Sequence, residues 1–100
     1  MENNQDNLNI LRKIQSKSHI TQRDLANELS FSLGKLNYCL KALKNKGLIK
    51  IKNFEKNKTK LNYIYLLTPK GISAKTKLTL NFMKKKMKEY NELQKELNER

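Results

Sequence analysis

Two short helical segments separated by a three-residue turn are the feature that most constrains this chain. Residues 22–29 and 33–46 both place apolar side chains three or four positions apart, which is the spacing of one face of an α-helix. Between them, Ser30-Phe31-Ser32 interrupts the periodicity. A helix of two turns, a short polar turn and a longer helix with an apolar inner stripe form the pattern of a helix-turn-helix.

Residues that start and stop helices lie at the ends of both segments. Thr21 is suited to cap the first helix because its hydroxyl can accept a hydrogen bond from the amide of Asp24, although Asp replaces the Glu or Gln of a complete capping box. Either Ser30 or Ser32 can cap the second helix. Gly47 ends it by supplying the left-handed conformation that other residues adopt at a cost. The predicted inner faces are Leu25, Ala26 and Leu29, then Leu33, Leu36, Leu40 and Leu43.

A further helix and a β-hairpin flank this motif. Apolar residues recur three positions apart within residues 6–16 and predict a short helix. Residues 48–54 and 61–67 are rich in Ile, Leu, Tyr and Phe and enclose a polar, turn-prone tip, so they predict the two strands of a hairpin. The apolar stripe of the first helix consists of Leu8, Leu11 and Ile14.

The last third of the chain predicts one long helix. Thr68 is suited to cap it and Pro69 to occupy its first position, where a missing amide hydrogen costs nothing. The helix can continue to about Asn98, and its second half carries a stripe with the alternating three- and four-residue spacing of a coiled coil. Because the rest of the chain offers this stripe no partner, we expect a homodimer. The expected dimerisation residues are Leu80, Met83, Met87, Tyr90 and Leu97, with Gln94 as a polar member of the stripe.

The order helix, helix-turn-helix, hairpin and long final helix is that of a winged helix-turn-helix. The predicted fold class is therefore mainly α, with a small β-hairpin wing and a long C-terminal dimerisation helix. We expect a polar N-terminal tail over residues 1–7, a winged helix-turn-helix DNA-binding domain over 8–69 and the dimerisation helix over 70–98. One hundred residues suffice for one compact domain and are too few for a catalytic domain beside it.

Three stretches resemble the MarR family of bacterial and archaeal regulators, namely Thr21–Leu29, Leu40–Ile49 and Leu66–Gly71. The Leu-x-x-Leu-x-x-x-Gly-Leu-Ile pattern of the second is common to many winged helices, whereas the Leu-Thr-Pro-Lys-Gly of the third is more particular. Within the family, the chain looks like the short members associated with exopolysaccharide gene clusters. The resemblance spans residues 8–90 and implies a homodimeric transcription regulator that binds double-stranded DNA.

Two departures from the family pattern limit what this resemblance implies. The familiar acidic-and-arginine wing tip is replaced by Glu55-Lys56-Asn57-Lys58, so insertion of an arginine into the minor groove is not implied. The N-terminal dimerisation helix of longer members is nearly absent, and with it one wall of their ligand cleft. A small-molecule effector is therefore not implied either, and its identity stays unknown.

The charge of the chain points to a polyanionic partner. Lys and Arg number 22 against 9 Asp and Glu, for a formal net charge of +13, and both nucleic acid and an anionic membrane suit such a charge. Residues 35–60 hold nine lysines and one acidic residue, so the charge lies on the second helix of the motif and on the hairpin. A merely solvated basic surface is the alternative, but the helix-turn-helix context favours a phosphate-binding face.

The exposed face of the helix over residues 33–46 supplies the candidates for reading base pairs, because in the family this helix lies in the major groove. Asn37 can pair with an adenine edge, Lys35 with guanine acceptors, and Tyr38 with a thymine methyl or a phosphate. Ser32, with the first amides of the helix, suits a backbone phosphate. The alternative for each position is a merely exposed polar side chain. The candidate residues are Ser32, Gly34, Lys35, Asn37, Tyr38 and Lys41.

The tip of the hairpin supplies candidates for affinity rather than for sequence preference. Its polar and basic side chains are expected along the DNA backbone or the adjacent minor groove, where contacts with phosphates are blind to sequence. These residues are Lys56, Asn57, Lys58 and Lys60.

No catalytic or metal-binding motif can be assembled from the sequence. One Cys, one His and scattered carboxylates offer no nucleophile–base pair, metal cluster or phosphate loop, so we expect no enzymatic activity, no metal and no cofactor. Cys39 is interpreted as a small apolar filler at the edge of the core, with a redox-sensing thiol as the alternative. His19 is interpreted as a surface or interhelix residue.

Two other functions compete with DNA binding. In the first, the winged fold is an interaction module that docks on protein or RNA; its docking face would more often carry clustered large apolar groups than the cationic, hydrogen-bonding face predicted here. In the second, the final helix lies on a membrane surface, as Phe82, Met83 and residues 84–86 suggest. The glutamates near the end of that helix argue against a position on a membrane surface: Glu89, Glu92, Glu96 and Glu99.

The sequence holds no run of about 18 apolar residues and no apolar core of a signal peptide. We therefore expect a cytoplasmic protein without a membrane partner. The operator, the target genes, the sign of regulation and any redox role of Cys39 are not encoded in a recognisable pattern.

Overall fold

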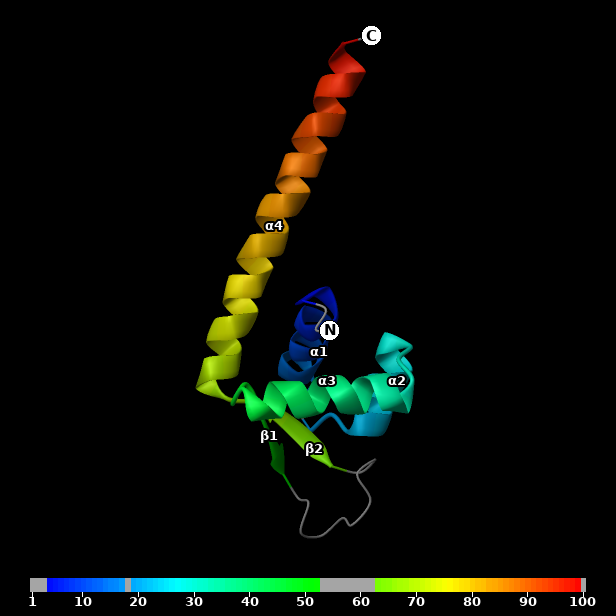
Figure 1. Cartoon of the computed structure of the whole chain (residues 1–100), viewed down its shortest axis with the longest axis vertical. Coiled ribbons are helices and arrows are strands. Elements are labelled where there is room, and N and C mark those ends of the chain that lie inside the picture. Colours follow the sequence, from blue (N-terminus) through cyan, green and yellow to red (C-terminus); the bar gives the residue numbers. More distant parts are fainter. Residues whose placement is uncertain (1–3, 18, 53–62, 100) are drawn as a thin grey trace.

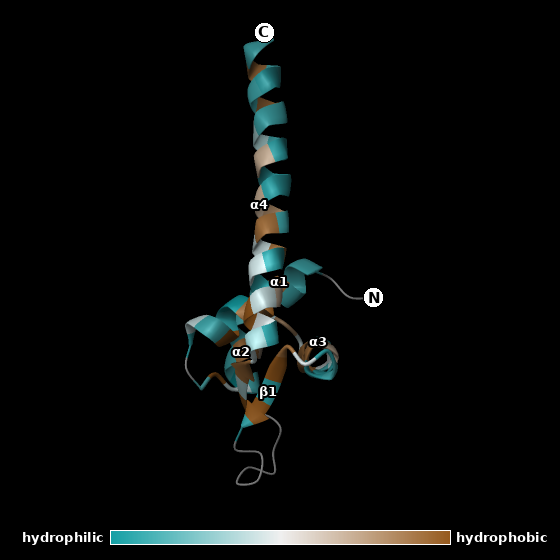
Figure 2. Cartoon of the chain, turned by 90° about the vertical axis from the view of Figure 1, so that its left-hand side faces the viewer, coloured by the Kyte–Doolittle hydropathy of each residue, from teal (hydrophilic) through white to brown (hydrophobic). Residues whose placement is uncertain are grey.

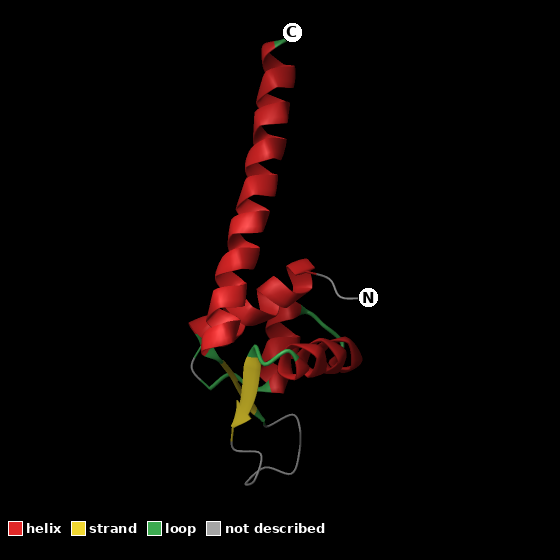
Figure 3. Cartoon of the chain, turned by 60° about the vertical axis from the view of Figure 1, so that its left-hand side comes forward, coloured by secondary structure: helices red, strands yellow, loops and turns green. Residues whose placement is uncertain are grey.

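The computed structural model describes residues 4–17, 19–52 and 63–99. The mainly α architecture with an antiparallel two-stranded hairpin confirms the predicted fold class (Figure 3). In Figure 1, α4 rises away from the group that the other elements form, and the hairpin points in the opposite direction. The elements are α1 (Asn4–Ser16), α2 (Gln22–Leu29), α3 (Leu33–Asn45), β1 (Ile49–Lys52), β2 (Ile64–Leu67) and α4 (Pro69–Asn98).

Hydroxyl side chains determine where three of the helices begin. In each case the hydroxyl accepts a hydrogen bond from the backbone amide three residues further on, which satisfies a donor without a partner inside the helix. The two serines between α2 and α3 have different roles: Ser32 caps α3, whereas Ser30 ends α2 in a left-handed conformation with φ of 56°. The capping hydroxyls belong to Thr21, Ser32 and Thr68, at 3.2, 3.1 and 3.0 Å from the amide nitrogens.

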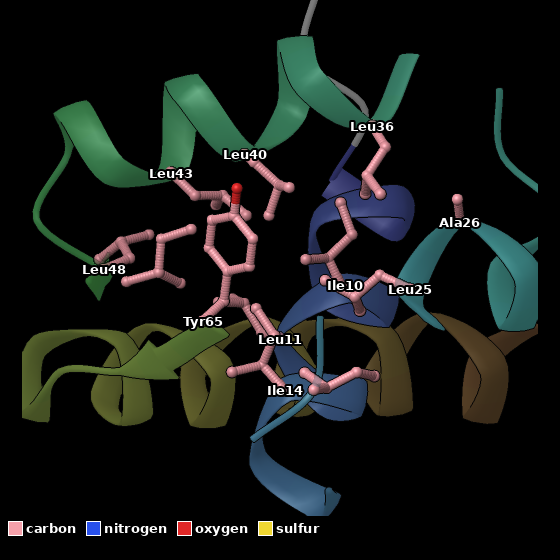
Figure 4. Close-up of a cluster of buried hydrophobic side chains, with 12 residues drawn as sticks. Ile10, Leu11, Ile14, Leu25, Ala26, Leu36, Leu40, Leu43, Leu48 and Tyr65 are labelled. Carbon is pink, nitrogen blue, oxygen red and sulfur yellow. The ribbon is translucent and has the colours of Figure 1, made fainter. Parts of the chain in front are cut away.

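The hydrophobic core lies between α1, the helix-turn-helix and the hairpin. Figure 4 shows Tyr65 of β2 reaching among the leucines of α3, while Ile10, Leu11 and Ile14 of α1 lie beside it. The early turns of α4 add Ala74 and Leu78, which are partly buried against this cluster. The buried cluster consists of Ile10, Leu11, Ile14, Ile20, Leu25, Ala26, Leu36, Leu40, Leu43, Leu48, Ile49 and Tyr65.

The prediction that Leu33 belongs to the inner stripe of α3 is wrong. Leu33 is 45% exposed, whereas Leu36, Leu40 and Leu43 are buried as predicted. Leu33 is the first residue of α3. Periodicity gives the direction of a side chain around the helix axis, but burial also requires another element opposite that end of the helix.

The hairpin is tied to the helix-turn-helix by a third extended segment. β1 and β2 pair antiparallel, with Ile49 opposite Leu67. On the other side of β2, the Tyr65 amide donates to the Ile20 carbonyl oxygen at 3.2 Å, and the segment before α2 forms an isolated bridge with the first residue of β2. The link before α2 therefore extends the sheet. Residues 53–62, which include the predicted strand ends and the tip, lie outside the described residues.

The start of α4 lies directly against the turn that follows α3. The Thr68 hydroxyl donates to the Gly47 carbonyl oxygen at 2.6 Å, and the Thr68 amide donates to the Leu48 carbonyl oxygen at 3.1 Å. A Cβ atom on Gly71 would lie 1.9 Å from that same Leu48 oxygen. Gly47 itself adopts the predicted left-handed conformation, with φ of 75°. The Gly-Leu-Ile and Leu-Thr-Pro-Lys-Gly stretches are therefore in contact, and Gly71 is present because the backbones approach closely.

Substitution of Gly71 by Ala tests this close approach. We expect Gly71→Ala to lower the free energy of unfolding by about 1–3 kcal/mol, because the added methyl group meets backbone that cannot move aside without displacing α4. Urea denaturation followed by circular dichroism measures the change. Gly34→Ala is the matched control: a Cβ there meets nothing within 4 Å, so it should be neutral or stabilising by up to about 1 kcal/mol. Equal stabilities of the two variants would contradict the assignment.

Candidate nucleic-acid interface

One face of α3 is turned away from the core and carries mainly polar and basic side chains. Its inner leucines hold the helix against the core, so the intervening positions face solvent. Tyr38, the largest side chain on this outer face, is 56% exposed. The structure thus brings the residues selected on this helix to one exposed surface. They are Ser32, Gly34, Lys35, Asn37, Tyr38 and Lys41, all classed as exposed.

The charged side chains of α3 and β1 are all positive. Between Leu29 and Lys52 the sequence contains six lysines and neither Asp nor Glu. All six lysines are exposed, so a polyanion approaching this surface meets cations from both elements. They are Lys35, Lys41, Lys44, Lys46, Lys50 and Lys52. The predicted wing-tip residues, Lys56, Asn57, Lys58 and Lys60, lie outside the described residues.

Lys35 has partners within the domain. Its Nζ lies 3.1 Å from the Asp6 carboxylate of α1 and 4.1 Å above the centroid of the Phe31 ring. An ion pair this exposed adds little stability, but the two contacts hold the long side chain against the start of α3. To pair with guanine acceptors, Lys35 has to leave Asp6, which sequence reasoning did not anticipate.

A buried glutamine connects the exposed face of α3 to the core. Gln22, the first residue of α2, is only 1% exposed. Its Nε2 donates to Oδ1 of Asn37 at 2.7 Å, and its Oε1 accepts from the Tyr65 hydroxyl at 3.5 Å. Buried amide groups need such partners, because an unsatisfied one costs free energy. Asn37 is therefore exposed to solvent, while a hydrogen bond from a buried residue orients its amide group.

Sequence reasoning missed Gln22 as a buried residue. It precedes Leu25 and Ala26 by three and four positions, which places it on the same face of α2. The helical period is therefore a sufficient signal, although the side chain is polar. The same network explains why Tyr65 is 4% exposed in spite of its hydroxyl group.

Burial changes the acidity of Tyr65. Removal of the phenol from solvent, with a smaller contribution from neighbouring Tyr63, raises the pKa of Tyr65 to about 12. The phenol is therefore neutral at physiological pH and keeps its hydrogen, so it can donate to Gln22. No deprotonation near neutral pH interrupts this hydrogen bond.

Cys39 and His19 have surroundings that fit the interpretations given to them from the sequence. Cys39 is partly buried and packs against the core cluster, where a small apolar filler is expected. His19 is exposed and has a left-handed backbone with φ of 59°. Within residues 4–17, 19–52 and 63–99, no three His, Cys, Asp or Glu side chains are grouped to hold a metal ion. Over the same residues, no helix combines the length and the apolar character needed to cross a bilayer.

Comparison with known proteins agrees with this architecture. Residues 7–50 match the family described as winged helix-turn-helix DNA-binding. No curated protein sequence matches the chain. The matched residues contain most of α1, the whole helix-turn-helix and the start of β1, so the outer face of α3 lies inside the matched domain.

Several solved structures share the fold. MarR of Staphylococcus aureus in complex with salicylate and kanamycin gives a TM-score of 0.73 at 23% identity, over 86% of this chain and 56% of that chain. A mutant of S. aureus MepR gives 0.74 at 22% identity, over 99% of this chain and 71% of the other. A mutant MarR from E. coli complexed with operator DNA gives 0.61 at 26% identity, over 72% and 50%. This chain thus spans little more than half the length of the first of these proteins.

The match over residues 7–50 and the shared fold identify a winged helix-turn-helix domain. The overall fold is shared with the MarR structures, in agreement with the resemblance seen in the sequence.

The raised pKa of Tyr65 predicts a loss of stability in alkali. The unfolded chain ionises this phenol near pH 10, whereas the folded protein holds it neutral up to about pH 12. The stability that comes from the neutral phenol is therefore complete below pH 10 and disappears as the pH rises towards 12, by up to about 2 kcal/mol. Urea unfolding of the protein and of Tyr65→Phe across this range measures the difference. Parallel curves for the two proteins would show that Tyr65 is not the group responsible.

Proposed function

We propose that this protein is a homodimeric transcription regulator that binds specific sequences in double-stranded DNA, with α3 in the major groove. The observation that carries the proposal is the outer face of α3, which is polar, exposed and free of acidic residues within a winged helix-turn-helix domain. The complex of E. coli MarR with operator DNA supports the same use of the fold here.

Base reading and backbone binding are assigned to different residues. Gly34, Lys35, Asn37, Tyr38 and Lys41 face the base edges from the outer side of α3. Ser32 and the first amides of α3 bind a phosphate, because the positive end of the helix dipole lies there. Further phosphates bind to lysines beside this face and on the wing, where contacts increase affinity without discriminating between sequences. These lysines are Lys44, Lys50 and Lys52, together with the wing-tip residues Lys56, Lys58 and Lys60, next to which Asn57 contributes a polar contact.

The second half of α4 forms the dimer interface in this proposal. Only Gly71 is buried in α4, and from Met83 onwards its large apolar side chains are exposed. Figure 2 shows brown, hydrophobic segments that alternate with teal, hydrophilic ones along the projecting helix. Leu93, which sequence reasoning left out, is also 61% exposed beside the predicted stripe. The expected interface residues are 51–69% exposed: Leu80, Met83, Met87, Tyr90 and Leu97.

A second copy of the chain is the partner that suits this stripe. A projecting helix with so much exposed apolar surface gains stability when that surface is covered, and most helical stability in water comes from such packing. Lys84, Lys88 and Glu92 flank the stripe along a shallow groove, as charged residues do beside a coiled-coil seam. Two copies would also supply two reading helices for a two-fold symmetric site.

Selection of bound sequences from a random duplex pool tests the DNA-binding proposal. We expect enrichment of a two-fold symmetric site, because a homodimer presents two equivalent α3 helices. Binding to that site should weaken with salt with a slope beyond about −5 in log affinity against log salt, since each neutralised phosphate contributes about −0.9. Fluorescence anisotropy at several salt concentrations measures the slope. A flat response without enrichment would favour an interaction module that docks on protein or RNA.

Charge placed in the stripe tests the dimer. The double substitution Met83→Glu and Met87→Glu should convert the dimer into a monomer of 11.8 kDa, because four carboxylates would be forced together across the interface. Light scattering at roughly 20 µM chain measures the mass, since dimer stability depends on concentration. Asn81→Glu is the control: it adds negative charge to α4 on the side away from the stripe, and the dimer should persist. A monomeric unsubstituted protein would contradict the proposal.

A further inference from the structure

The chemistry of an asparagine amide sets what Asn37 can recognise. The side chain has one carbonyl oxygen that accepts hydrogen bonds and one NH₂ group that donates two. Pairing with adenine uses both groups at once, because the NH₂ donates to N7 while the oxygen accepts from the N6 amino group. Guanine presents two neighbouring acceptors, N7 and O6, and thymine presents O4. An asparagine that offers only donors therefore suits guanine, with two acceptors side by side, better than adenine, where the N6 amino donor lies beside the N7 acceptor.

In this structure the carbonyl oxygen of Asn37 already accepts one hydrogen bond from inside the domain. Oδ1 of Asn37 accepts from Nε2 of Gln22 at 2.7 Å, a short distance for a neutral N–H···O hydrogen bond. Gln22 lies beneath α3 and is buried, so this bond draws the carbonyl oxygen of Asn37 towards the core. The NH₂ group, on the other branch of the planar amide, is then left at the exposed side of the residue.

The orientation of the Gln22 amide is set by its hydrogen bond with Tyr65. Its Oε1 accepts from the Tyr65 hydroxyl, and the Tyr65 side chain extends from β2 with its hydroxyl pointing towards α3 (Figure 4). A tyrosine hydroxyl that donates to the oxygen of Gln22 leaves the NH₂ group of Gln22 directed at Asn37. The three side chains form a series in which each hydrogen bond sets the direction of the next.

We propose that the series Tyr65–Gln22–Asn37 makes Asn37 a hydrogen-bond donor to DNA, so that it favours guanine, which presents two acceptors, over adenine, which presents one acceptor beside a donor. Gln22 is thus a positioning residue that determines specificity without touching DNA. This inference rests on the proposed function, because it requires α3 to lie in the major groove. It replaces the adenine pairing expected from residue type alone, in which both amide groups of Asn37 were available.

Selection from a random duplex pool with three variants tests the inference. Asn37→Ala identifies the base position that Asn37 reads, because preference should disappear there and nowhere else in the half-site. Gln22→Met keeps the length of the side chain and removes both of its hydrogen-bonding groups, which frees the Asn37 amide to rotate. At the Asn37 position, we expect guanine in the unsubstituted protein and a gain of about 10-fold for adenine relative to guanine in Gln22→Met.

Two further variants of the chain complete the test. Tyr65→Phe retains Gln22 and removes the donor that orients it, so it should shift preference in the same direction even if Gln22→Met does not fold. Gln15→Met makes the same substitution at an exposed glutamine on α1, and base preference should stay as in the unsubstituted protein. Circular dichroism and competition binding with duplexes that differ at the one position complete the comparison.

The outcomes separate this inference from the proposed function. An enriched site with adenine at the Asn37 position of the unsubstituted protein overturns the inference and leaves DNA binding standing. An unchanged preference in folded Gln22→Met and Tyr65→Phe also overturns it. The absence of any enriched sequence overturns the proposed function itself, and the inference with it.

Discussion

The contact between the start of α4 and the turn after α3 is the constraint on which the arrangement of the molecule depends. Thr68 donates hydrogen bonds to the carbonyl oxygens of Gly47 and Leu48, and Gly71 leaves room for the latter. These contacts fix the direction in which α4 leaves the domain. They thereby fix the position of the exposed apolar stripe relative to the outer face of α3, and in the proposed dimer this relation sets the spacing of the two reading helices.

A second constraint acts through polar groups rather than through packing. Gln22 is buried beneath α3 and satisfies both of its amide groups with Asn37 and Tyr65. Such a residue stabilises little by itself, since a hydrogen bond in the protein replaces one with water. Its main effect is to restrict an exposed side chain to one orientation. In the proposed function, a core residue thus acts on DNA through the orientation that it gives to Asn37.

Sequence reasoning performed best where the physical cause is local. The caps at Thr21, Ser32 and Thr68 were predictable because a hydroxyl and an amide three residues apart meet whenever a helix starts there. It failed at Leu33, where burial depends on which element lies opposite the end of a helix. The outer face of α3 could be selected from its period, but the contact of Lys35 with Asp6 of α1 could not, because the two residues are 29 positions apart and meet only after α1 packs.

The sequence alone therefore determined the elements, their order, the basic surface and the MarR-type fold, since each follows from spacing, caps and charge within short stretches. Only the tertiary structure decided why position 71 is glycine, which side chains are already paired and which way Asn37 presents its amide. These properties arise from contacts such as Gly71 with Leu48 and Gln22 with Asn37. The sequence pattern alone does not reveal these contacts, because the partners are remote in sequence and their approach is set by the packing of whole helices.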